Sequence, residues 1–281
     1  MSSRRRVAFV TGASRGIGRA SAIALARAGY DVAVGARTLV DGTAVLEDGK
    51  TLLPGGLDST VEAIEAAGAR GHAVRMDVLD RKSVLAAADD VLERFGRIDL
   101  LLNNAIYQGP GSMTPLLEIE DAEILRMFEG NVHAQVALIR HLLPTFVAQG
   151  GAIVINMISA TARLDPPGRI GKGGWGMAYA MTKAAFERVA PLLMVEHGDD
   201  GIVAYSIDPG YVITERAIAT QRRAGFEEHF VGAPPEVVGA AVAWLATDPG
   251  APAEYGGKIV LALREAKRRK LVDGWPPPRP A

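Results

Sequence analysis

Short runs of apolar residues alternate with longer stretches of helical periodicity from one end of the chain to the other. The apolar runs have the length of buried strands and fall at residues 7–10, 31–35, 71–76, 98–103, 152–156, 202–207 and 258–263. Helical spacing covers residues 18–28, a stretch from residue 59, and residues 82–95, 120–149, 178–197 and 235–246. This alternation predicts an α/β fold, with a doubly wound parallel sheet of about seven strands flanked by helices.

Most connections between these elements are short, and the exceptions are the loops at residues 38–57, 107–115 and 160–177. Loops of this length are usually functional or disordered. Asp48-Gly49 gives the first loop a hairpin signal, and Ser59 with Glu62 predicts a capping box at the helix that follows. Because no linker, repeat or shift in composition divides the chain, we expect a single domain over residues 1–281, with residues 264–281 as a C-terminal tail.

Composition narrows the function classes. The 31 basic and 32 acidic residues give a net charge of -1, which argues against nucleic acid as a partner. The absence of cysteine excludes disulfides, thiolate catalysis and cysteine-ligated metals, and we expect no metal site. The first apolar run is too short for a signal peptide, and no run approaches the ~18 apolar residues of a membrane span. We therefore expect a cytoplasmic protein with no membrane partner.

Three glycines, Gly12, Gly16 and Gly18, lie between the first expected strand and the first expected helix. Glycines here allow a tight turn, close approach of the backbone to a pyrophosphate, and close packing of helix on strand. The amides at the helix N-terminus would then face the phosphates. Glycines are also common in simple turns, but at this position in an alternating chain they predict a dinucleotide site on a Rossmann fold.

The spacing Thr11-Gly12-x-x-x-Gly16-Ile17-Gly18 resembles that of the short-chain dehydrogenase/reductase family. The resemblance spans about residues 6–263 and continues in family order through Asp77-Val78, Asn103-Asn104-Ala105, Asn131, Ser159, Tyr179-x-x-x-Lys183 and Pro209-Gly210-x-Val212-x-Thr214. One departure is Ile106, which stands where the family has a glycine beside the cofactor.

The resemblance implies a nicotinamide cofactor and a role for each matching position. The residue at Asp77 contacts adenine, Asn103 and Ala105 line the side of the adenine ribose, and the segment from Pro209 to Thr214 holds the nicotinamide carboxamide. Together with the two arginines discussed next, the expected cofactor-binding residues are Gly12, Ser14, Arg15, Gly16, Ile17, Gly18, Arg37, Asp77, Val78, Asn104, Ala105, Tyr179, Lys183, Pro209, Gly210, Val212 and Thr214.

The end of the second expected strand indicates which dinucleotide binds. NAD-dependent enzymes place an acid there for the ribose 2′-hydroxyl, and this chain has Ala36 instead. Arg15 and Arg37 can converge on a 2′-phosphate, which a guanidinium group matches in a bidentate manner. Both arginines could instead be solvated surface residues. Their positions and the missing acid together favour NADP(H).

Tyr179 and Lys183 project from one face of a helix, one turn apart. A nearby ammonium, helped by the positive nicotinamide ring of the oxidised cofactor, stabilises phenolate, so we expect Lys183 to help lower the pKa of Tyr179 and make it a general acid and base. The resemblance implies that Ser159 hydrogen-bonds the substrate oxygen and that Asn131 holds a water for proton relay. Each feature alone has an ordinary structural explanation, whereas the full set predicts catalysis. A non-catalytic NADP-binding sensor or scaffold is the alternative.

The stretch between Ser159 and Tyr179 is longer than is common in the family, because residues 164–175 are added. We predict that this insertion forms a lid or a pocket wall, with Trp175 facing the substrate; an exposed excursion is the alternative. The expected pocket draws on Ser159, residues 164–177, Tyr211 and residues 213–230, including Ile218, Phe226 and Phe230. It suggests an apolar carbonyl or alcohol substrate. The basic run 264–270, near a C-terminal helix end, is expected to face solvent, and family practice suggests a homo-oligomer, a tetramer or a dimer.

Overall fold

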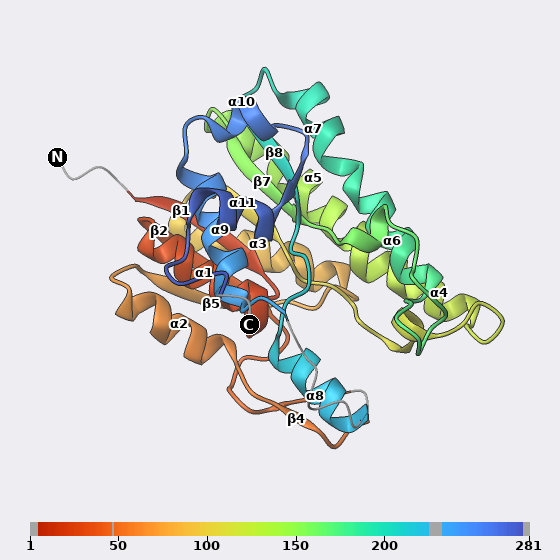
Figure 1. Cartoon of the computed structure of the whole chain (residues 1–281). Coiled ribbons are helices and arrows are strands. Elements are labelled where there is room, and N and C mark those ends of the chain that lie inside the picture. The colour runs from red at the N-terminus through yellow and green to blue at the C-terminus, as the bar shows by residue number, and fades with distance from the viewer. Residues whose placement is uncertain (1–4, 47, 225–231, 278–281) are drawn as a thin grey trace.

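Seven parallel strands form the central sheet of the computed structural model, which describes residues 5–46, 48–224 and 232–277 (Figure 1). The strands are β1 (Arg6–Thr11), β2 (Tyr30–Ala36), β5 (Gly71–Arg75), β6 (Leu100–Asn103), β7 (Ala152–Met157), β8 (Ile202–Asp208) and β9 (Ile259–Leu261). They lie in the order β5-β2-β1-β6-β7-β8-β9. The predicted seven-stranded, doubly wound sheet is confirmed, with every predicted strand in place.

Helices pack against both faces of the sheet, because its central strands are apolar on both sides. One face carries α1 (Gly16–Arg27), α2 (Leu57–Ala66), α9 (Pro235–Thr247), α10 (Ala251–Tyr255) and α11 (Ala262–Arg269). The other carries α3 (Arg81–Phe95), α5 (Ala134–Ala148) and α7 (Val189–His197). Each layer encloses its own apolar core, and the sheet separates the two.

Three further helices follow strand ends on the carboxyl side of the sheet: α4 (Asp121–Phe128), α6 (Met177–Glu187) and α8 (Glu215–Ala224). Short 3-10 turns are η1 (Pro110–Met113) and η3 (Ala160–Ala162). The helix expected over residues 120–149 is divided by a π-helical turn, η2 (Glu129–His133), which lies between α4 and α5. Similarly, the stretch 178–197 is divided into α6 and α7.

The capping box predicted at Ser59 is wrong. Helix α2 begins two residues earlier at Leu57, with Gly56 as its N-cap and no side-chain cap. Ser59 lies inside the first turn, where its hydroxyl donates back to the carbonyl of Gly56 at 3.3 Å. Leu57 is fully buried, so packing of the first turn against the core decides where this helix starts.

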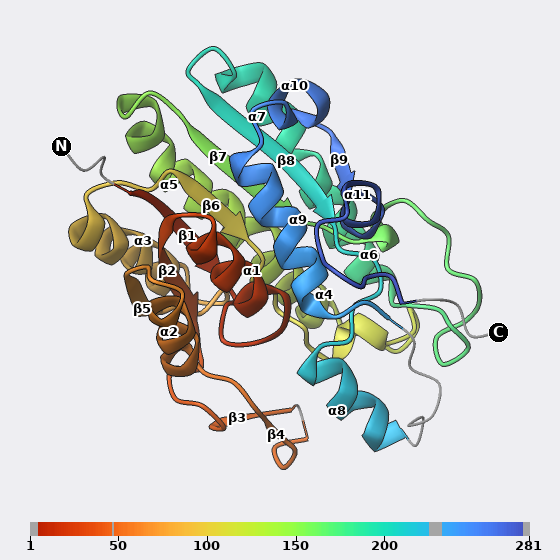
Figure 2. The ribbon, with the colours of Figure 1, turned by 60° about the vertical axis from the view of Figure 1, so that its left-hand side comes forward.

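The hairpin signal in the first long loop is confirmed. β3 (Ala44–Val45) and β4 (Leu52–Leu53) pair antiparallel and form a small separate sheet. This hairpin lies beside α8, below the main body of the molecule in Figures 1 and 2. Two segments far apart in the sequence therefore meet near the carboxyl edge of the sheet.

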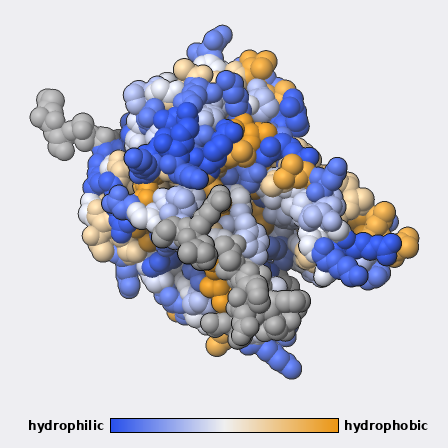
Figure 3. All heavy atoms as spheres, viewed as in Figure 1, coloured by the Kyte–Doolittle hydropathy of each residue, from blue (hydrophilic) through white to orange (hydrophobic). Residues whose placement is uncertain are grey.

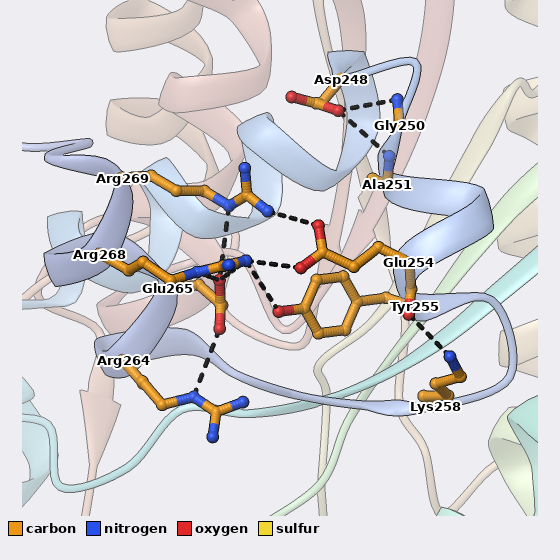
Figure 4. Close-up of polar contacts among 10 residues, drawn as sticks. All are labelled: Asp248, Gly250, Ala251, Glu254, Tyr255, Lys258, Arg264, Glu265, Arg268 and Arg269. Carbon is orange, nitrogen blue, oxygen red and sulfur yellow. Dashed lines mark hydrogen bonds and ion pairs between the residues drawn. The ribbon is translucent and has the colours of Figure 1, made fainter.

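The last strand is shorter than predicted, and a helix follows it. β9 ends at Leu261, and residues 262–269 form helix α11 instead of extending the strand or beginning a tail. The basic run does not simply face solvent. Glu265 is only 1% exposed and forms ion pairs with Arg264, Arg268 and Arg269 (Figure 4). Arg268 and Arg269 also form ion pairs with Glu254.

Polar side chains dominate the face of the molecule seen in Figure 3, and apolar groups are scattered over it in small areas. In the part of the chain that the structure describes, no helix is both long enough and apolar enough to span a bilayer.

Candidate active site

A cleft of about 440 Å³ opens at the carboxyl ends of β1, β2 and β6. The chain turns toward opposite halves of the sheet on either side of β1, which is where doubly wound sheets bind ligands. Its lining comes from five segments: the glycine turn 12–18 without Ala13, residues 36–38 after β2, Val45 and Leu46 of the hairpin loop, residues 104–110 after β6, and Thr214 with Arg216. Met76 and Val78 complete it.

The glycine turn has the geometry that a pyrophosphate requires. Gly12 and Gly16 adopt positive φ angles of 68° and 55°, which favour glycine. A Cβ on Gly18 would lie 2.2 Å from the carbonyl oxygen of Gly12, so only glycine allows α1 to pack this close to the turn. Helix α1 begins at Gly16 with no side-chain cap and no acid in its first turn. Its first amides therefore remain suited to phosphate oxygens.

Asn104 and Thr11 fix this turn to the end of β6. The Asn104 side-chain amide donates to the carbonyls of Thr11 and Gly12, at 3.0 and 3.1 Å. In return the Thr11 hydroxyl accepts from the backbone amides of Asn104 and Ala105, at 3.0 and 3.1 Å. The role of Thr11 was not predicted; a polar residue ending a buried strand is the signal that could have indicated it.

The loop after Ala105 stays against the cleft although Ile106 replaces the family glycine. Ile106 itself lines the cleft, as do the four residues that follow it. Gln135 donates to the carbonyl of Ala105 at 2.7 Å, and Asn131 accepts from the amide of Tyr107 at 2.7 Å. These two side chains hold the loop from behind, so the larger side chain does not displace it. The role of Gln135 was also not predicted.

Most of the predicted cofactor residues lie together. Those that line the cleft are Gly12, Ser14, Arg15, Gly16, Ile17, Gly18, Arg37, Val78, Asn104, Ala105 and Thr214. Those outside its lining are Asp77, Tyr179, Lys183, Pro209, Gly210 and Val212. The carboxylate of Asp77 accepts from the amide of Leu79 at 3.0 Å, so it caps its own turn. The adenine contact of Asp77 stays a prediction.

The predicted catalytic residues form a second group, next to this cleft but not within its lining. Lys183 is 2% exposed, and its Nζ lies 5.8 Å from the centroid of the Tyr179 ring. The same Nζ donates to the carbonyl of Met157, at the end of β7, at 2.8 Å. Ser159 lies two residues after the end of that strand, and its side chain is close enough to Tyr179 to lower the pKa of the phenol. The structure thus brings Ser159, Tyr179 and Lys183 together.

Burial is the largest influence on the pKa of Tyr179. Burial raises the pKa of Tyr179 to about 12, the hydrogen bond with Ser159 offsets part of that rise, and the Asp208 carboxylate adds to it. Burial also lowers the pKa of Lys183 to about 8, against the influence of Asp208. Packed protein atoms around both groups disfavour both charged forms. The lowering of the Tyr179 pKa by Lys183 and the cofactor together stays a prediction.

Asp208, the last residue of β8, is a charged neighbour of this group that was not predicted. One carboxylate oxygen accepts from the amide of Gly210 at 3.0 Å, and the other pairs with Arg163 at 3.0 Å. Arg163 also pairs with Glu187 at 3.1 Å, and so connects the segment after Ser159 to helix α6. The available signal was an acid directly before Pro209.

Asn131 is 1% exposed and lies in the π-helical turn η2. Besides accepting from Tyr107, it donates to the Thr182 hydroxyl at 3.3 Å, next to Lys183. Its side chain therefore connects the cleft loop to the catalytic helix. The predicted part of Asn131 in a water relay stays a prediction.

The insertion between Ser159 and Tyr179 docks at its C-terminal end. Gly176 donates to the carbonyl of Ser112 at 3.0 Å, and a Cβ on Gly176 would lie 2.6 Å from that oxygen. Trp175, just before it, is half-buried, whereas Leu164 at the other end is 60% exposed. Among the other predicted pocket residues Tyr211 is 56% exposed; Phe226 and Phe230 lie outside the described residues.

This arrangement matches a known family. The short chain dehydrogenase family model matches residues 6–224. The chain belongs to this family. A short chain dehydrogenase of Monascus purpureus is 35% identical over 75% of this chain and 66% of its own length. An oxidoreductase of Mycobacterium tuberculosis that is named as NAD-dependent is 31% identical over 90% of this chain and 93% of its own.

Solved structures agree on the fold. Levodione reductase superposes with a TM-score of 0.74 and 24% identity, over 91% of this chain and 95% of its own. Membership of the family makes the protein an oxidoreductase that binds a nicotinamide cofactor and transfers hydride at CH–OH or C=O groups. Within the described residues no three His, Asp or Glu side chains are grouped as metal ligands.

Proposed function

We propose that the protein is an NADP(H)-dependent oxidoreductase that transfers hydride between the nicotinamide and an apolar carbonyl or secondary alcohol. The observation that carries the choice of cofactor is the end of β2, where Ala36 and Arg37 line the cleft. Arg15 lines the same cleft from the glycine turn. An acid that would bind a ribose 2′-hydroxyl is missing at Ala36, and Arg37, with the remaining donors of Arg15, can bind a 2′-phosphate.

The residues of the cleft fit a dinucleotide. The turn at Gly12 and Gly16 leaves room for a pyrophosphate, and the amides at the start of α1 can donate to it. Apolar Met76 and Val78 are suited to the flat faces of adenine. When bound, the cofactor supplies or accepts the hydride at the substrate carbon.

The remaining chemistry belongs to the protein. In reduction, the hydroxyl of Tyr179 gives its proton to the carbonyl oxygen; in oxidation, the phenolate takes the proton from the alcohol. Ser159 donates to the same oxygen and stabilises its negative charge as the reaction proceeds. Lys183, charged when the site is filled, lowers the pKa of Tyr179 together with the positive nicotinamide ring of the oxidised cofactor. Both contributions act against burial, which raises the pKa of Tyr179 to about 12.

The test is to follow nicotinamide absorbance with panels of ketones, aldehydes and alcohols, using NADPH and NADH in parallel. We expect turnover with NADPH, and a loss of about 100- to 10,000-fold in Tyr179→Phe because general acid catalysis is removed. Arg37→Ala should weaken NADPH binding about tenfold, the value of one charge-assisted hydrogen bond. A preference for NADH would refute the cofactor assignment, as the name of the Mycobacterium relative would suggest.

A protein that binds NADPH tightly and turns over no substrate in this panel would instead favour the sensor or scaffold. An intact set of Ser159, Tyr179 and Lys183 supports the enzyme, because a sensor has no use for a buried lysine beside a tyrosine. A homo-oligomeric state stays a prediction, which sedimentation analysis can test.

A further inference from the structure

Arg216, in the first turn of α8, lines the same cleft as the glycine turn and the end of β2. Its Nη2 donates to the carbonyl of Gln108 at 3.0 Å. The guanidinium group thus extends from α8 to the loop after β6, two segments that are more than a hundred residues apart in the sequence. No motif of the family identifies this residue, and it was not among the predicted cofactor residues.

Three guanidinium groups share this one cleft: Arg15, Arg37 and Arg216. Burial lowers the pKa of Arg216, and the charges of Arg37 and Arg15 lower it further. Arg37 also lowers the pKa of Arg15, while Glu215 and Asp41 act in the opposite direction there. Like charges that are held together in a partly desolvated space repel one another. A bound multivalent anion would make the electrostatic energy of these arginines favourable.

The three arginines differ in their hydrogen bonds within the protein and in their burial. The Arg15 guanidinium donates to the carbonyls of Pro54 and Gly55, both at 2.8 Å, which directs it toward the hairpin loop. Arg37 is exposed on the rim. Arg216 is the more buried of these last two, and Arg37 acts on it more strongly than Arg15 does. Helix α8 also packs beside β4 of the hairpin toward which Arg15 is directed, which places the start of α8 on the side of the cleft where the adenosine ribose is bound in this fold.

We propose that Arg216 is a third arginine of the 2′-phosphate site, supplied by α8. This inference rests on the proposed preference for NADP(H). The segment that follows β8 would then contribute both to the cofactor cleft, through Arg216, and to the expected substrate pocket. A bound 2′-phosphate would then hold the start of α8 in place, whereas NADH would not.

The test measures binding directly, without substrate. Dissociation constants for NADPH, NADH, 2′,5′-ADP and 5′-ADP are determined by calorimetry for the wild type, Arg216→Ala, Arg216→Gln and Arg37→Ala. Arg27→Ala is the matched control, because it removes the same charge at the exposed last turn of α1, outside the cleft lining. Melting temperatures verify that each variant is folded.

For both Arg216 variants we expect NADPH and 2′,5′-ADP to bind about tenfold more weakly, with NADH and 5′-ADP changed less than about twofold. In the wild type, NADPH should protect the backbone amides of residues 214–217 from hydrogen exchange more than NADH does. Equal weakening of both dinucleotides would place Arg216 at the pyrophosphate and overturn the proposal. An unchanged NADPH affinity, or an equal loss in Arg27→Ala, would overturn it as well.

These outcomes are separate from those of the proposed function. If the wild type binds NADH more tightly than NADPH, the proposed cofactor preference fails. The contribution of Arg216 is still measured by the ratio of 2′,5′-ADP to 5′-ADP affinity. A loss of that ratio in Arg216→Ala supports the site, and an unaltered ratio refutes it.

Discussion

Substitution of Asp208 by asparagine should move the pH profile of the enzyme to lower pH. The carboxylate raises the pKa of both Tyr179 and Lys183, so its neutralisation lowers both values. Asparagine keeps an acceptor oxygen for the amide of Gly210, which preserves the turn after β8. In alcohol oxidation, activity increases as Tyr179 loses its proton. The limb of the profile should therefore shift toward lower pH.

The size of this shift can be estimated from the position of Asp208. β8 is paired with β7, after which Ser159 follows, and paired strands lie about 5 Å apart, so the carboxylate lies within about 10 Å of the reacting oxygen. At an effective dielectric constant of about 20, one charge at this distance contributes about 1.7 kcal/mol, or about one pH unit. Arg163 neutralises part of that charge, which reduces the expected shift to about half a unit to one unit.

The assay is kcat/KM for alcohol oxidation against pH, with Arg163→Gln as the matched control. Removal of the arginine leaves Asp208 and Glu187 without its compensating charge, so the limb should move to higher pH. Opposite shifts in two variants with similar maximal rates cannot arise from a general loss of structure. Shifts in the same direction, or a fixed limb in Asp208→Asn, would refute the electrostatic role of Asp208.

Three further substitutions test the site. Gly18→Ala should destabilise the fold by about 1–3 kcal/mol and weaken dinucleotide binding, because the added Cβ meets the Gly12 carbonyl; chemical denaturation and calorimetry measure both effects. Asn104→Ala should cost about 1–3 kcal/mol of unfolding free energy in the same assay, since it removes the donor to the carbonyls of Thr11 and Gly12. Lys183 has a folded pKa of about 8, below its unfolded value, so it contributes stability that increases as the pH rises from about 8 to about 10. Lys183→Met should abolish that increase of about 3 kcal/mol, and equal pH dependence in both proteins would contradict the burial of a titrating lysine.

The features that were predictable from the sequence are those set by local pattern. Apolar runs separated by helical periodicity predict the parallel sheet, and the glycine spacing predicts the turn at Gly12 and Gly16. The helix 262–269 was not predictable in this way, since the apolar run continues through Leu261 and Leu263 as in a strand. The helix buries Glu265 among three arginines and Tyr255, and that stabilisation exists only after folding.

The chemistry of Tyr179 was predictable only in part, for the same physical reason. Four-residue spacing places Lys183 beside Tyr179, and the structure confirms that proximity. Spacing carries no information on desolvation, which depends on every element packed around the two side chains. Burial raises the pKa of Tyr179, which opposes the lowering expected from Lys183 and the cofactor.

The residues that determine cofactor specificity were also predictable only in part. Arg15 and Arg37 belong to the first turn and the end of β2, where the family motifs lie, and they can therefore be identified from the sequence. A further part of the cleft lining comes from the segment after β8, about 180 residues further along the chain. Its charge enters the specificity only because the fold returns that segment to the cleft. If Arg216 acts as proposed, a substitution in α8 can change cofactor preference while both residues identified from the motifs stay unaltered.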